Sequence, residues 1–301
     1  MDAKNFIPRG IIPAMVTPLN ADESVNYDAL EAHIDFLIKQ GVHGIFVIGT
    51  TGEFYALSYD EKRKIIQSAI KATNGRVPVY AGTGGITTKE CIELTQMAEK
   101  EGVDAVSILT PMFISPSQED LYIHYKKIAE NTALPVILYN NVPRTGVNIS
   151  VKTCERLALV DNIVGIKDSS GNFDLTSEYI RVTRDNPSFH VLQGRDTHIL
   201  AGLSYGATGA IAATSNVAPS LVVSIYENFI KGDMKAALEA QFKLAPLRMA
   251  FTLGTFPMVI KSALQMIGIN AGPCKSPIRD LTKDEKEQLK QVLVQMNLVK
   301  E

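Results

Sequence analysis

The sequence predicts a (β/α)8 barrel followed by a C-terminal helical extension. Short apolar runs rich in β-branched residues recur at a steady interval, and amphipathic helical patterns lie between them. Eight such units in series favour a closed parallel barrel over an open doubly wound sheet, which usually has fewer strands. The chain of 301 residues is long enough for one such barrel, and no inter-domain linker is visible. The predicted strands are residues 10–18, 44–50, 77–83, 105–111, 135–140, 163–169, 190–196 and 206–214.

The first helical pattern shows how the helices are recognised. Leu30, Ile34, Leu37 and Ile38 share one face of a helix, and Gly41 ends the pattern. Three other helix starts have a hydroxyl residue three positions before a carboxylate, which is the spacing of a capping box. These pairs are Ser58 with Glu61, Thr87 with Glu90, and Ser117 with Asp120.

Residues 1–231 are expected to form the barrel and residues 232–301 the helical extension. Gly232 and Asp233 open the extension, in which helical patterns cover residues 234–241, 256–266 and 282–298. A barrel does not need these helices. We expect them to pack on its outside or at a subunit contact.

Composition narrows the function to small-molecule chemistry. A net charge of −2 and the lack of a basic stretch argue against nucleic acid as a partner. No apolar run approaches the length of a membrane span, and the N-terminus does not resemble a signal peptide. Cys91, Cys154 and Cys274 are far apart and odd in number, which favours a reducing, cytoplasmic compartment.

No metal site is predicted. The histidines are not paired with carboxylates at the spacings of metal sites, and the cysteines do not fit such spacings either. We assign no histidine to catalysis. The five histidines are His33, His43, His124, His190 and His198.

Lys167 is the most informative residue, because it ends an apolar strand-like run. Alternation along that strand places Gly165 and Lys167 on the opposite face from Val164 and Ile166, toward a crowded interior. Desolvation there favours the neutral amine, which is the nucleophile needed to form a Schiff base with a ketone or an aldehyde. Alternatively, the side chain reaches water or a carboxylate such as Asp168.

A Gly-Thr-Thr-Gly turn follows the second predicted strand, where barrel enzymes gather their active-site residues. Thr50 and Thr51 supply hydroxyls, and Gly52 allows backbone N–H groups to approach a ligand closely. The turn therefore fits a small carboxylate. A tight strand-to-helix turn capped by threonine explains the same residues.

Two further candidates follow the fifth predicted strand. The phenol of Tyr139 could pass protons to and from a Schiff base, although it could also serve only in barrel packing. Arg144 could anchor a carboxylate through two hydrogen bonds, or it could be an ordinary surface arginine. Both would share one barrel mouth with Lys167.

With these residues in place, the chain resembles the pyruvate-dependent class I aldolases and lyases typified by dihydrodipicolinate synthase and N-acetylneuraminate lyase. The resemblance covers nearly the whole chain. It is most specific in Gly-Thr-Thr-Gly-Glu at 49–53, in Tyr139, and in Lys167 twenty-eight positions later.

The resemblance implies a role for each candidate residue. Lys167 forms the imine with pyruvate or another 2-oxo acid, without a separate cofactor, and Tyr139 is the general acid and base. Thr50 and Thr51 hold the acid carboxylate and help to relay protons, and Gly52 belongs to the same cradle. Ile211 faces the 2-oxo acid through its backbone. The resemblance further implies that Arg144 contacts an acidic second substrate and that the protein is a homotetramer built from tight dimers.

Phe113 departs from the family pattern. It occupies the position of a tyrosine that these enzymes contribute across the dimer interface to the proton relay, and a phenyl ring cannot transfer a proton. We therefore expect a Schiff-base lyase that acts on pyruvate, a 2-oxo-3-deoxy sugar acid or a hydroxy-oxo acid, with an aldehyde partner. The first alternative is 4-hydroxy-tetrahydrodipicolinate (dihydrodipicolinate) synthase. Others are an enzyme like 5-dehydro-4-deoxyglucarate dehydratase, and a non-catalytic binding paralogue.

Overall fold

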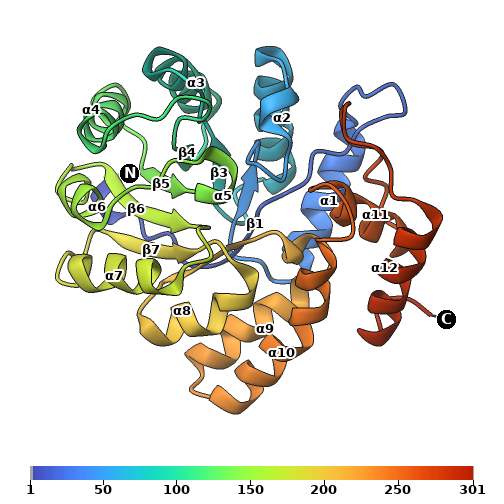
Figure 1. Ribbon diagram of the computed structural model, residues 1–301. Coiled ribbons are helices and arrows are strands. Elements are labelled where there is room, and N and C mark those ends of the chain that lie inside the picture. The colour runs from blue at the N-terminus through green and yellow to red at the C-terminus, as the bar shows by residue number, and fades with distance from the viewer. Residues whose placement is uncertain (1–2, 301) are drawn as a thin grey trace.

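The protein is a barrel of eight parallel strands, described by a computed structural model for residues 3–300 (Figure 1). The strand order is β1-β8-β7-β6-β5-β4-β3-β2, and a bridge between Ala14 and Phe46 joins the first strand to the second. The predicted (β/α)8 fold is confirmed. The strands are β1 (Gly10–Pro13), β2 (Ile45–Val47), β3 (Val79–Gly82), β4 (Ala105–Leu109), β5 (Val136–Asn140), β6 (Ile163–Asp168), β7 (His190–Gln193) and β8 (Gly209–Ala212).

Most of the strands end earlier than the apolar runs that predicted them. The first run was expected to extend to residue 18, but β1 ends at Pro13. Beyond it, the N–H of Val16 donates to the side-chain oxygen of Asn216 at 3.1 Å instead of to a neighbouring strand. The carboxyl ends of the runs thus leave the sheet and build the mouth of the barrel.

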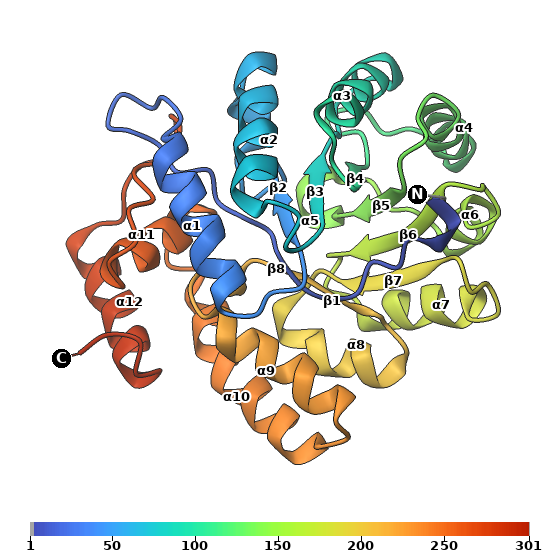
Figure 2. The same ribbon diagram turned by 180° about the vertical axis from the view of Figure 1, so that it is seen from behind.

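Helices surround the strands, as Figure 2 shows from behind. The capping boxes at Ser58 and Ser117 are confirmed. Thr87 caps its helix, but the Glu90 carboxylate accepts from the N–H of Ile86, so the predicted reciprocal bond is absent there. The helices between the strands are α1 (Tyr27–Lys39), α2 (Tyr59–Thr73), α3 (Thr88–Glu101), α4 (Gln118–Ala129), α5 (Val142–Thr145), α6 (Val151–Leu157), α7 (Phe173–Thr183) and α8 (Ile199–Tyr205).

The barrel interior is filled by side chains and is not an open pore. Inward-facing residues of the strands form one buried cluster, which includes Ile12, Phe46, Tyr80, Leu192 and Ile211. Larger clusters fill the space between the sheet and the helices. The floor beneath the mouth is therefore formed by packed side chains.

The C-terminal extension contributes more to the molecule than outside packing. Its helices lie along one side of the barrel (Figure 1), and α10 continues through Pro246 to Ala250, further than its pattern predicted. Arg248, Phe251 and Phe256 line the pocket described below, which corrects the expectation of a purely external role. The division between residues 231 and 232 stays a prediction. The remaining helices are α9 (Pro219–Ile230), α10 (Met234–Ala250), α11 (Met258–Met266) and α12 (Lys283–Gln295).

A buried ion pair connects the extension to the turn after β2. The Lys261 ammonium lies 2.6 Å from a carboxylate oxygen of Glu53, and both side chains are at most 1% exposed. The other Glu53 oxygen accepts from the N–H of Lys275 at 2.8 Å. Lys261 also donates to the carbonyl of Pro273 at 2.6 Å. The turn that carries Thr50 and Thr51 is thus held by residues more than two hundred positions away.

Candidate active site

Tyr139 and Lys167 are brought together by the register of two neighbouring strands. Residue 139 of β5 pairs directly with residue 167 of β6, so both side chains emerge on the same face at the carboxyl end of the barrel. The Lys167 ammonium lies 4.1 Å from the centre of the Tyr139 ring and 5.2 Å from that of Phe46. The predicted pair therefore shares one site.

Lys167 does not pair with Asp168, which was the alternative explanation for its charge. The Asp168 carboxylate faces away from the pocket, where it accepts from Asn140 at 3.0 Å and from Thr176 at 2.6 Å. Lys167 is 4% exposed, and no described residue forms a hydrogen bond or an ion pair with its ammonium. A buried amine surrounded by aromatic faces and a cavity suits a nucleophile better than a structural cation.

The Tyr139 hydroxyl is the centre of a small hydrogen-bond network. It accepts from the Asn141 amide at 2.9 Å and lies 3.4 Å from the Thr50 hydroxyl. Burial by itself raises the pKa of Tyr139. The Lys167 charge and the hydrogen bonds of Thr50, Ser169 and Asn141 outweigh burial, so the pKa lies below the usual 10.0. The phenol is thus prepared to exchange a proton with a group beside Lys167.

The turn after β2 lines the pocket and has donors without a hydrogen-bond partner in residues 3–300. The backbone N–H groups of Thr50 and Thr51 and the Thr51 hydroxyl have no hydrogen-bond partner among residues 3–300. Such donors suit a small carboxylate. Gly52 does not line the pocket: its carbonyl accepts from the Thr17 hydroxyl at 2.7 Å, and an added Cβ would lie 3.1 Å from the Met15 carbonyl. Its predicted role in substrate binding stays a prediction.

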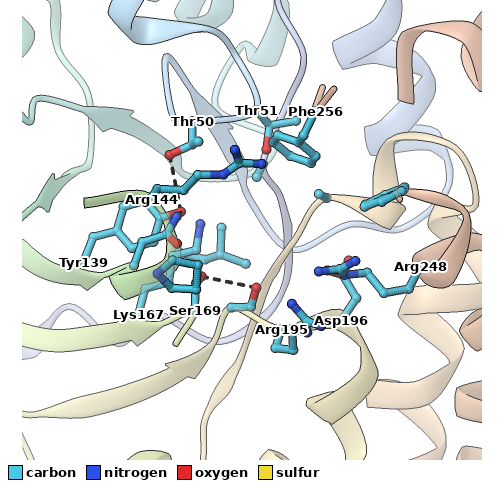
Figure 3. A pocket seen from close by; sticks show the side chains of 17 residues that line it. Thr50, Thr51, Tyr139, Arg144, Lys167, Ser169, Arg195, Asp196, Arg248 and Phe256 are labelled. Atoms are coloured by element: carbon cyan, nitrogen blue, oxygen red, sulfur yellow. Dashed lines mark hydrogen bonds and ion pairs between the residues drawn. The ribbon is translucent and has the colours of Figure 1, made fainter. Parts of the chain in front are cut away.

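These residues enclose a cavity of about 210 Å³, shown in Figure 3. Lys167 lies on its floor, and Arg144 of α5 reaches over it from the rim. Ile211 of β8 is also among the residues that line it. Since a water molecule occupies roughly 30 Å³ of liquid, the cavity has room for a small acid and a short partner molecule. Of the predicted site residues, the structure brings together Lys167, Tyr139, Thr50, Thr51, Arg144 and Ile211.

The opposite side of the cavity contains residues that the sequence analysis missed. Arg195 and Asp196 lie two and three residues after the end of β7, and Arg248, Phe251 and Phe256 come from the extension. The rule that polar residues at strand ends form the site would have identified the first two, because the seventh predicted strand ended at Asp196. The other three residues reach the cavity because of how α10 and the segment after it pack on the barrel. No local sequence pattern indicates this packing.

Phe113 is not part of this cavity. It lies after β4 with 95% of its surface exposed, and its backbone has a left-handed φ of 73°. For a bulky residue this conformation is unusual and costs free energy. The expected position across a subunit interface stays a prediction, as does the tetramer.

Neither a metal-binding cluster nor a membrane-spanning helix is found among the described residues. Among residues 3–300, His, Cys, Asp and Glu side chains form no group of three or more that could hold a metal ion. Within the same part of the chain, no helix has the length and apolar character required to span a bilayer. The predicted cytoplasmic location stays a prediction.

Comparisons with known proteins cover almost the whole chain. The model of the "Dihydrodipicolinate synthetase family" matches residues 7–296. The 4-hydroxy-tetrahydrodipicolinate synthase of Methanopyrus kandleri is 38% identical, over 98% of this chain and 99% of that protein. The crystal structure of dihydrodipicolinate synthase from Thermotoga maritima superposes with a TM-score of 0.94 at 32% identity, covering 97% and 99% of the two chains.

A second solved structure contains a bound 2-oxo acid. It is YagE, a prophage protein of the dihydrodipicolinic acid synthase family from E. coli K12, in complex with pyruvate. Its TM-score is 0.94 at 34% identity, and the superposition covers 97% of this chain and 100% of that chain. The similarity thus extends to one protein whose structure was solved with pyruvate bound.

Proposed function

The chain belongs to the dihydrodipicolinate synthetase family and is a Schiff-base-forming lyase, and we propose that it joins pyruvate to aspartate semialdehyde, as 4-hydroxy-tetrahydrodipicolinate synthase does. From the sequence alone, this reaction is the first alternative to a Schiff-base lyase that acts on pyruvate, a 2-oxo-3-deoxy sugar acid or a hydroxy-oxo acid. The names of the similar proteins favour the synthase. The observation that carries the proposal is the Lys167 amine, buried without a carboxylate partner at 4.1 Å from the ring of Tyr139.

In the proposed mechanism, Lys167 attacks the carbonyl carbon of the 2-oxo acid. A C–N bond forms, water leaves and an iminium results, which withdraws electrons from the neighbouring carbon. Loss of a proton from that carbon gives an enamine, which forms a C–C bond with the aldehyde. Water then adds to the imine and releases the product. No external oxidant or reductant is required.

Tyr139 and Thr50 would move the protons that these steps require. The Tyr139 hydroxyl lies 3.4 Å from that of Thr50, so a proton can pass between them with a small adjustment. The pKa of Tyr139 lies below the usual 10.0, so its hydroxyl gives up a proton more readily than an ordinary phenol does. The free N–H groups of Thr50 and Thr51 would hold the carboxylate of the 2-oxo acid.

Borohydride reduction with pyruvate tests the imine directly. The intact protein should gain the mass of one reduced pyruvate adduct, and peptide analysis should locate that adduct on Lys167. A Lys167→Ala variant should gain no adduct. Lys89→Ala, which changes a lysine that is 87% exposed, should react like the unchanged protein. If the unchanged protein forms no adduct with any 2-oxo acid, the Schiff-base proposal fails.

Phe113 favours a second candidate, the cleavage or dehydration of a 2-oxo-3-deoxy sugar acid, because the hydroxyl expected in the synthase relay is missing. Product analysis separates the two. The synthase predicts condensation of pyruvate with aspartate semialdehyde, whereas the alternative predicts loss of pyruvate or water from the sugar acid. A Phe113→Tyr variant should increase the condensation if the relay lacks only this hydroxyl. An unchanged rate would mean that other groups have replaced it.

A further inference from the structure

Three guanidinium groups face the cavity, but it contains only one carboxylate. Arg144 comes from α5, Arg195 from just beyond β7 and Arg248 from α10. Among the described residues that line the cavity, Asp196 is the only acidic one. No side chain among residues 3–300 forms a hydrogen bond or ion pair with the guanidinium of Arg144 or Arg195. Gathering like charges costs free energy, so this arrangement requires an explanation.

Asp196 neutralises only part of this charge. One of its oxygens is occupied by Thr214, accepting from the N–H at 2.8 Å and from the hydroxyl at 2.6 Å. The other lies 3.6 Å from Nε of Arg248, which is an ion pair but too long for a hydrogen bond. The other Arg248 nitrogens therefore keep their donors for a ligand.

The position of Arg248 is fixed by the surrounding structure. Gln241 of α10 donates to the Asp196 carbonyl at 3.0 Å and accepts from the N–H of Leu200 at 3.0 Å, which anchors the helix to the end of β7. Arg248 is seven residues, or two turns, further along and lies on the same helix face. Its guanidinium also lies 5.2 Å from the centre of the Phe251 ring. A preorganised donor of this kind suits binding.

The electrostatics of Arg248 favour the binding of an anion. Burial lowers the pKa of Arg248, and the charges of Arg195 and Arg144 lower it further, against the opposing effect of Asp196. An anion bound between the guanidinium groups would relieve this repulsion. Arginine is the side chain best suited to carboxylate and phosphate, since its planar donors bind both in a bidentate manner.

The place of these arginines indicates which part of a substrate they would bind. Thr50 and Tyr139 lie on one side of Lys167, and Arg195, Asp196 and Arg248 lie on the other (Figure 3). The carboxylate of the 2-oxo acid is already assigned to the Thr50 side. The aldehyde must approach the carbon next to the imine, so its far end extends toward the arginines.

We propose that Arg195 and Arg248 bind an anionic group at the far end of the aldehyde partner, so that the enzyme selects aldehydes carrying a carboxylate or a phosphate away from the reacting carbonyl. The inference rests on the Schiff-base function proposed above. It adds two specificity-determining residues to Arg144, which reaches the same space from the rim. It applies to condensation and to the reverse cleavage, in which that aldehyde is the product.

Matched aldehyde pairs test the proposal. Condensation with pyruvate is measured for glyceraldehyde against glyceraldehyde 3-phosphate, and for butanal against succinic semialdehyde. The unchanged enzyme should prefer the charged member of at least one pair by ~10-fold or more in kcat/KM, since only the charged member can form charge-assisted hydrogen bonds with the guanidinium groups. The preferred pair identifies the anion as phosphate or carboxylate.

Arg195→Gln and Arg248→Gln should each reduce that preference by ~10-fold or more, mainly through KM for the charged aldehyde. Arg184→Gln is the matched control, because Arg184 lies on the surface beside Asp185. This variant should keep the preference for the charged aldehyde. Arg195 has no side-chain hydrogen bond to lose, so its variant tests the site without disturbing the fold. An unchanged preference in both variants, or no preference in the unchanged enzyme, would overturn the proposal.

Borohydride trapping with pyruvate, run in parallel, distinguishes the two possible failures. If the unchanged enzyme traps pyruvate but shows no charge preference, the arginine site is wrong and the Schiff-base function stands. If it traps no 2-oxo acid, the Schiff-base function itself is wrong. Trapping by the arginine variants together with a lost preference supports the arginine site.

Discussion

Two buried lysines lie at the mouth of the barrel in opposite environments. Lys261 is fully buried, and its ammonium lies 2.6 Å from Glu53 and 2.6 Å from the Pro273 carbonyl. Lys167 is nearly as buried, yet its ammonium faces the rings of Tyr139 and Phe46 and a cavity. The same side chain is therefore satisfied by partners in one place and left available in the other.

The difference indicates how burial should be interpreted. A buried charge is tolerated when a counter-charge and hydrogen bonds compensate for lost hydration, and such a pair is structural. A buried amine without these partners is destabilising, and structures keep such groups mainly where chemistry uses them. Burial is common to both lysines, so the surroundings of the nitrogen decide the role.

Replacing Lys167 should have the largest effect on activity. Lys167→Ala removes the only proposed nucleophile, and turnover should fall by at least about 10³-fold. The free energy of unfolding of this variant should differ from that of the unchanged protein by no more than about 1 kcal/mol, because no ion pair is lost. Steady-state kinetics and urea unfolding measure the two quantities. Substantial residual turnover would show that Lys167 is not the nucleophile. A large loss of stability would show that Lys167, like Lys261, has a structural role.

Replacing Lys261 should have the opposite effect. Lys261→Met leaves the Glu53 carboxylate buried without its counter-charge, and the free energy of unfolding should fall by about 3–5 kcal/mol. Adding Glu53→Gln should restore part of this loss, because it removes the unpaired charge. Urea unfolding of both variants measures the recovery. If Lys261→Met is as stable as the unchanged protein, the pair is not structural.

A smaller, pH-dependent effect is expected from a third buried basic group, His33 of α1. Its Nε2 donates to the side-chain oxygen of Asn216 at 3.1 Å, and the same amide donates to the carbonyl of Ala14, which lines the cavity. Burial lowers the pKa of His33 from 6.5 to about 4, against the opposing effect of the Asn216 hydrogen bond. The folded protein thus keeps this ring neutral at pH values where the unfolded chain protonates it.

The direction of the pH effect follows from that difference. Above pH 6.5 the ring is neutral in both states, so it causes no loss of stability. As the pH falls from 6.5 to 4, only the unfolded chain gains the proton, and the free energy of unfolding should fall by up to about 3 kcal/mol. A His33→Gln variant should show a shallower decline over this range. Parallel curves for the two proteins would contradict the assignment.

The residues that sequence reasoning found share one property: each lies in a recognisable strand or within a few residues of its carboxyl end. Tyr139 and Lys167 could be predicted because apolar runs locate β5 and β6, and because barrel sites gather at strand ends. Their register could not be predicted in detail, although it is the register that brings the two side chains together. The resemblance to a family gave these positions their expected roles.

Apart from Arg195 and Asp196, which lie at the end of a predicted strand, the residues that it missed depend on contacts between distant parts of the chain. Arg248 reaches the cavity only because Gln241 attaches α10 to the end of β7, and the Lys261–Glu53 pair spans more than two hundred residues. Local periodicity predicts where a helix forms, but not the angle at which it packs. The extension was therefore recognised as helical, whereas its part in the cavity was not.

The pairing of Glu53 with Lys261 and Lys275 has a consequence for the order in which the protein becomes functional during synthesis. All eight strands have been translated by residue 212, and the barrel could assemble from them. The Thr50 turn then still lacks its anchor, and the wall that includes Arg248 does not yet exist. A nascent chain with a complete sheet would therefore have the proposed nucleophile, Lys167, but an unfinished site. The site would be complete only once the last quarter of the chain has left the ribosome.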